Sequence, residues 1–98
     1  MNLKRMMDQA RQMQEEMGRR VEKISVEGTA GGGAVTIGMN GKREVLSVKL
    51  DPQAVDPQDL EMLQDLILAA FQDASRKVEE KVQKEVGGML GGLGVPGL

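Results

Sequence analysis

The 98-residue chain carries 13 basic and 15 acidic side chains, a net charge of −2, and contains no Cys, His, Trp or Tyr. Without Cys there is no disulfide or thiol chemistry, and without His the commonest general base and metal ligand is missing, so we expect no cofactor and no metal. Because eight Met and a single Phe specify a small core poorly, we expect a second copy of the chain to complete it. No apolar run approaches the roughly 20 residues of a membrane span, and the start MNLKRMMDQA is not a signal peptide, so we expect a cytoplasmic protein with no membrane partner.

The charge is unevenly distributed along the chain. Residues 1–24 have a net charge of +2, residues 25–50 of +1 and residues 51–86 of −5. An acidic chain argues against nucleic acid as a partner, and the basic first quarter weakens that objection.

Residues 2–24 are predicted to form a long amphipathic helix. Apolar side chains recur there at steps of three and four residues, the spacing of one helix face. They are Leu3, Met6, Ala10, Met13, Met17 and Ile24. This stripe fits a face packed on the chain's own core or a coiled-coil-like seam between two chains, and the sequence leaves both open.

A first strand is predicted to follow over residues 24–29, because apolar and polar residues alternate there. The glycines of the connector at residues 29–33 suggest a phosphate-binding loop. However, no Ser or Thr follows Gly41-Lys42, and no Gly-x-Gly-x-x-Gly pattern opens a helix here. A plain hairpin loop is therefore favoured.

Residues 33–51 predict a β-hairpin with Asn40-Gly41 at its turn, because a type I′ turn favours this pair of residues. A two-residue loop would place Val35 opposite Leu46. One face of the hairpin then collects Val35, Ile37, Met39, Leu46, Val48 and Leu50. That face needs another element to cover it.

A second long helix is predicted over residues 57–86, with Asp56 as its N-cap and Pro57 at its first position. An apolar stripe runs along it and is broad at first, as on a sheet, then narrow, as in a projecting arm. The stripe consists of Leu60, Leu63, Leu66, Ile67, Ala70, Phe71, Ala74, Val78, Val82 and Val86. Gly87-Gly88 is expected to end the helix, so that residues 1–86 form a single domain and residues 87–98 a flexible Gly-rich tail.

Element lengths predict the architecture. The helices would extend about 35 Å and 45 Å at 1.5 Å per residue, whereas eight-residue strands reach only about 27 Å. Both helices should therefore overhang the sheet. We expect an α+β fold of order α-β-β-β-α, with a small antiparallel sheet and two long helices projecting as arms in a homodimer.

The ordered set of segments MMDQARQMQEEM, VEGTAGGGAVTIGMNG, VLSVKLDP and LEMLQDLILAAFQDASRKVEEK resembles the YbaB/EbfC family of bacterial nucleoid-associated proteins. The resemblance covers essentially the whole chain, and the succession of NG, LDP and LQDLILAAFQDA is its most specific part. It implies a dimer whose helical arms grip duplex DNA like tweezers, with loose sequence selectivity. It also implies a place in the nucleoid and a role in nucleoid organisation or gene regulation.

If the chain binds DNA as the resemblance implies, affinity should come mainly from Lys and Arg near phosphates. The candidate DNA-binding residues lie on both helices and are Lys4, Arg5, Arg11, Arg19, Arg20, Lys77, Lys81 and Lys84. Lys23 and Arg76 belong to the same two sets. Those expected near the arm tips rank first: Lys4, Arg5, Arg11 and Lys84. Each is also compatible with a solvated charge, for example in an Arg11–Glu15 pair.

Two other classes of function are weighed against DNA binding. An enzyme with a small-molecule substrate is disfavoured, because the adjacent acids Glu15-Glu16 and Glu79-Glu80 point about 100° apart on a helix and do not converge. A dimeric protein-interaction adaptor or chaperone-like clamp is the alternative, because amphipathic, Met-rich arms also suit adaptable protein contacts.

Overall fold

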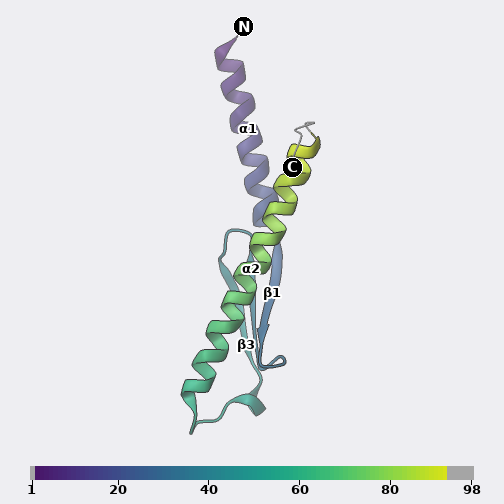
Figure 1. Cartoon of the computed structure of the whole chain (residues 1–98). Helices are drawn as coiled ribbons and strands as arrows, with labels where there is room; N and C mark the ends of the chain where they lie inside the picture. The colour runs from purple at the N-terminus through teal and green to yellow at the C-terminus, as the bar shows by residue number, and fades with distance from the viewer. Residues whose placement is uncertain (1, 93–98) are drawn as a thin grey trace.

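The computed structural model describes residues 2–92, and Figure 1 shows two long helices on a small sheet. The elements in chain order are α1 (Leu3–Glu22), β1 (Ser25–Ala30), β2 (Val35–Asn40), β3 (Val45–Leu50), the short 3-10 helix η1 (Pro52–Ala54) and α2 (Leu60–Gly92). This order confirms the predicted α-β-β-β-α fold. The molecule is elongated, with extents of 69 × 26 × 16 Å. None of the helices within residues 2–92 is long and apolar enough to cross a membrane.

The three strands form one antiparallel sheet in the order β1-β2-β3. Gly31, Gly32 and Gly33 connect the first two strands with φ angles of 65°, 66° and 99°. Residues with a side chain rarely adopt this left-handed conformation, which explains the run of glycines. The predicted hairpin loop at this run is confirmed.

The register of the second hairpin differs from the prediction. Val35 pairs with Leu50 and Ile37 with Val48, whereas a two-residue loop would have placed Val35 opposite Leu46. A bulge at Gly38/Met39 shifts the pairing near the loop. Because directly paired residues share a face, the apolar ends of the two strands still lie on one side of the sheet.

The cause lies in the loop at residues 41–44, which is longer than a type I′ turn. The Asn40 side chain accepts hydrogen bonds from the backbone N–H groups of Lys42 at 2.9 Å and Glu44 at 3.0 Å. Within the described residues, Arg43 is the one non-glycine with positive φ, at 64°, and Gly41 is not among the positive-φ glycines. The Asn40 amide thus organises a wider turn, and the predicted type I′ turn is wrong.

Helix α2 lies across β1 and β2 and closes the core on one face of the sheet (Figure 1). The buried cluster consists of Ile24, Val26, Val35, Ile37, Met39, Ala70, Ala74 and Val78. At Gly28 the helix is so close that a Cβ atom would overlap the carbonyl oxygen of Ala70 and the backbone nitrogen of Ala74. Small residues on both elements therefore allow backbone to approach backbone.

Helix α1 stands away from this core. Asn2 caps its N-terminus by accepting a hydrogen bond from the Arg5 N–H at 3.4 Å, and none of its residues is buried. The alternative in which its apolar stripe packs on the chain's own core is therefore wrong. Figure 1 shows α1 and the second half of α2 extending past the sheet in the same general direction, as predicted for two arms.

Both ends of α2 differ from the prediction. The N-cap is Asp59, whose carboxylate accepts the Met62 N–H at 3.1 Å. The predicted N-cap, Asp56, accepts the Gln58 N–H at 2.9 Å and so belongs to a turn before the helix. The helix also continues to Gly92, through the two glycines expected to end it.

A glycine costs a helix about 1 kcal/mol relative to Ala but does not forbid it, since the backbone N–H is retained. This explains why Gly87-Gly88 does not terminate α2. The remainder of the expected flexible tail, residues 93–98, lies outside the described residues.

Candidate nucleic-acid interface

The predicted cations of the first arm lie on an exposed helix. Lys4, Arg5 and Arg11 occupy its first half, and Arg19 lies in its last turn. Arg11 lies 3.6 Å from Asp8, three residues earlier, and not beside the expected Glu15. An exposed pair of this kind contributes at most about 1 kcal/mol, so Arg11 can leave Asp8 at little cost.

A group of four cations lies where the two arms leave the sheet. A cleft of about 440 Å³, here called the arm-root cleft, separates the end of α1 from the second half of α2. Its lining residues are Arg20, Lys23, Ile24, Ser25, Lys81, Lys84 and Glu85. The lining thus holds one carboxylate and four cations, which come from the end of α1, its C-cap Lys23 and α2, and its net charge is positive.

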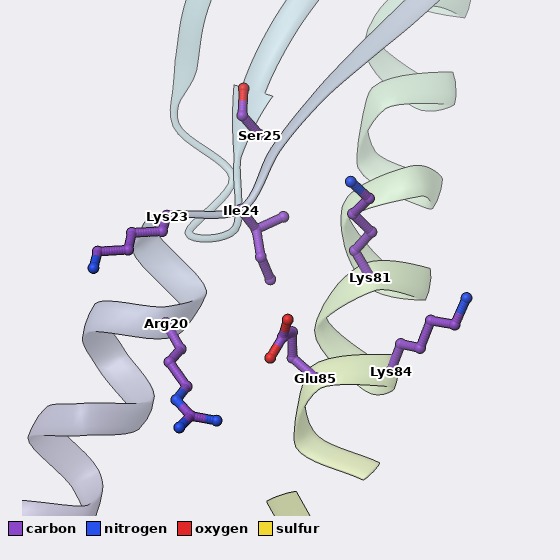
Figure 2. A pocket seen from close by; sticks show the side chains of 7 residues that line it. All are labelled: Arg20, Lys23, Ile24, Ser25, Lys81, Lys84 and Glu85. Atoms are coloured by element: carbon purple, nitrogen blue, oxygen red, sulfur yellow. The ribbon is translucent and has the colours of Figure 1, made fainter. Parts of the chain in front are cut away.

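Figure 2 shows how these side chains lie. Arg20 from α1 and Glu85 from α2 extend into the gap between the helices, while Lys23 and Lys84 extend away from it on opposite sides. Arg20 is also bound by Glu16 at 3.1 Å on its own helix. The cations therefore form a rim of long, flexible side chains around the gap, suited to anionic groups spread over a surface.

Two cations of α2, Arg76 and Lys77, contact other groups of the chain. Lys77 donates to the Glu27 carbonyl of β1 at 2.9 Å and lies 3.0 Å from the Asp73 carboxylate. Arg76 donates to the same carboxylate at 2.6 Å. This carboxylate also accepts the Thr29 N–H at 3.0 Å. Asp73 and Lys77 thus bind backbone groups of β1 and fasten α2 to that strand.

The Thr29 N–H, together with the ammonium group of Lys77, lowers the pKa of the Asp73 carboxyl below its ordinary value of 3.8. Since the folded-state pKa is the lower one, the ionised carboxylate stabilises the fold above the ordinary pKa, and this stabilisation is lost as pH falls through the lowered value.

We expect Asp73→Asn to lower the free energy of unfolding at neutral pH, because Asn can still accept the Thr29 N–H but carries no charge. The difference from wild type should shrink as pH falls from about 4, where Asp73 of the unfolded chain becomes protonated, through the lower pKa of the folded carboxyl. Urea unfolding followed by circular dichroism at several pH values measures this. A difference that stays constant into acid would contradict the proposed charge effect.

From the sequence, the cations of this site are predicted only as two separate sets, one on each helix. The structure brings Arg20 and Lys23 together with Lys81 and Lys84 at the arm root, although about 60 residues separate the two sets. The contribution of Glu85 was not anticipated. Its position one residue after Lys84 gives no local indication that it faces α1.

Fold and site together define a class: a small α-β-β-β-α protein whose terminal helices project from a three-stranded sheet and share a basic cleft at their root. The chain belongs to the YbaB/EbfC DNA-binding family, which it matches over residues 1–93.

Comparisons with individual proteins agree with this assignment. The chain is 47% identical to a nucleoid-associated protein of Koribacter versatilis, covering 98% of this chain and 95% of that protein. It is 48% identical to a nucleoid-associated protein of Alkaliphilus metalliredigens, covering 99% and 88%. The crystal structure of an uncharacterized protein from Helicobacter pylori superimposes with a TM-score of 0.74 over 92% of this chain and 98% of that one. At 22% identity, that likeness shows the shared fold.

Proposed function

We propose that this protein binds duplex DNA with little sequence selectivity, through cations on its projecting arms, and so acts in nucleoid organisation and gene expression. The observation that carries the proposal is the arm-root cleft, where both helices contribute cations in a chain of a DNA-binding family. The names of the relatives support a location at the nucleoid.

The chemistry of the site favours phosphate over base recognition. Lys and Arg side chains neutralise phosphates and release condensed counterions, a contribution that is independent of sequence. The chain has one aromatic residue, Phe71, so it offers no platform on which successive bases of a single strand could stack. Duplex DNA is therefore the favoured nucleic acid.

We expect the affinity of the full chain for a duplex to fall steeply with salt, as a straight line in log K against log salt concentration. Its slope should be roughly −0.9 for each phosphate contacted. Fluorescence anisotropy on a labelled duplex of mixed sequence measures this. Absence of binding at low salt would contradict the proposal and favour the protein-interaction adaptor.

We also propose a homodimer formed through the uncovered part of the sheet. Val48 and Leu50 share the core face of the sheet with Ile37 and Val35, yet they are 53% and 42% exposed. Helix α2 leaves β3 bare on this face, and Phe71, expected in the core, is itself 40% exposed. A second copy of the chain would cover these apolar side chains, the remedy expected for so small a core.

Val48→Asp should convert a dimer into a monomer, because it would place a charge in the proposed apolar contact. Light scattering at micromolar concentration distinguishes the two states. Lys49→Ser changes the neighbouring residue, on the opposite face of β3, and should leave the dimer intact. A monomeric wild type would contradict the proposed assembly.

A further inference from the structure

The direction of arm α1 must be fixed at its root. No residue of α1 is buried, and the helix rises from the sheet as a separate arm (Figure 1). The nearest buried residue is Ile24, just after the helix, which belongs to the hydrophobic core. What holds Ile24 and the last turn of α1 therefore decides where the rest of the arm points.

Gly41, in the loop between β2 and β3, lies against this last turn. Its N–H donates to the Ile24 carbonyl at 3.1 Å, and the Ile24 N–H donates to the Val21 carbonyl at 3.1 Å. A Cβ atom on Gly41 would overlap the Val21 carbonyl oxygen and lie 2.9 Å from Val21 Cγ1. Glycine is thus the residue that lets the loop approach the helix backbone at this point.

The same loop also reaches both arms through side chains. Lys42 lies 3.6 Å from Glu22 at the end of α1, and Arg43 lies 3.9 Å from Glu79 on α2. All four side chains are at least half exposed, so neither pair can hold an arm firmly. Of the contacts between this loop and the arms, the close approach of the Gly41 backbone to Val21 and Ile24 is therefore the one that can hold α1.

We propose that Gly41 is a positioning residue: its contact with Val21 and Ile24 sets the direction of α1 relative to α2 and thereby the width of the arm-root cleft. The effect on DNA binding rests on the proposed function, whereas the effect on arm direction does not. A small displacement at Val21 tilts the helix. The resulting displacement of the helix axis grows with distance from Val21 and is largest near Lys4, roughly 26 Å away.

The chain has no Cys, so Gln14→Cys and Gln83→Cys place two spin labels specifically on exposed positions of α1 and α2. Double electron–electron resonance, with an excess of unlabelled chain to suppress distances between copies, reports the separation of the arms. Gly41→Ala should shift or broaden this distance distribution and weaken duplex binding severalfold. Gly18→Ala is the matched control, since nothing lies within 4 Å of its added Cβ.

An unchanged distribution in folded Gly41→Ala overturns the proposal. Restoration of the wild-type distribution by adding Val21→Ala also overturns it, because the conflict would then lie with the side chain and not with the backbone. Should Gly41→Ala fail to fold, Lys42→Ala with Arg43→Gly decides: the distances should be unchanged, and a shift would assign the positioning to the ion pairs instead. If the wild type fails to bind DNA, the proposed function fails, and the distances still test the role of Gly41.

Discussion

Replacing Gly28 with Val should destabilise the fold by about 3 kcal/mol, the upper end of what overpacking a core usually costs. The reason is that a Cβ at this position of β1 would overlap the backbone of α2 at Ala70 and Ala74, and backbone cannot move aside as a side chain can. Strand and helix would have to separate along the core. Such a loss is a large fraction of the roughly 5–15 kcal/mol by which typical domains are stable.

Urea unfolding followed by far-ultraviolet circular dichroism measures this change, since the chain has no Trp or Tyr for fluorescence. Both proteins must be compared at equal concentration if the native state is a dimer. The control is Gly18→Ala in α1, where the added methyl group meets open space and should stabilise the helix by up to about 1 kcal/mol. If Gly28→Val unfolds at the wild-type urea concentration, the close packing of α2 on β1 is wrong.

The pattern of apolar residues predicted the element order well, because it records which faces are buried. The narrowing of the stripe in α2 did not mark where that helix leaves the sheet. Val78, in the narrow part, is buried with Ala70 and Ala74, whereas Leu60 and Leu68 of the broad part are more than half exposed. The same stripe wrongly placed Phe71 inside. Periodicity identifies a face, but which part of the face is covered depends on where neighbouring elements end.

Local motifs were less reliable wherever several residues could play one role. Asp51, Asp56 and Asp59 each accept a hydrogen bond from a backbone N–H two or three residues later, yet only Asp59 begins the long helix. Likewise, Asn40-Gly41 matches a type I′ turn, but Gly41 is required for its contact with Val21, far away in the sequence. The arm-root cleft could not be predicted either, because its residues come from two segments that are far apart in the sequence.

The second large effect is expected on DNA affinity, when the cations of the arm-root cleft are removed. Changing Arg20, Lys81 and Lys84 together to Ala should weaken duplex binding at least about tenfold near 0.1 M salt. The slope of log K against log salt concentration should also become less negative, by roughly one for each phosphate that the variant no longer neutralises. All three side chains are exposed, so the fold should be affected little. Anisotropy titrations over a range of salt concentrations measure both quantities.

The matched comparison is the triple change of Lys4, Arg5 and Arg11 to Ala, which removes the same three charges from the exposed first half of α1. The cleft variant should lose more affinity, because its cations come from two helices that can face one phosphate backbone, whereas the tip cations follow a single helix. Equal losses would mean that overall charge alone governs binding. A larger loss in the tip variant would return the binding site to the arm tips, where sequence reasoning first placed it.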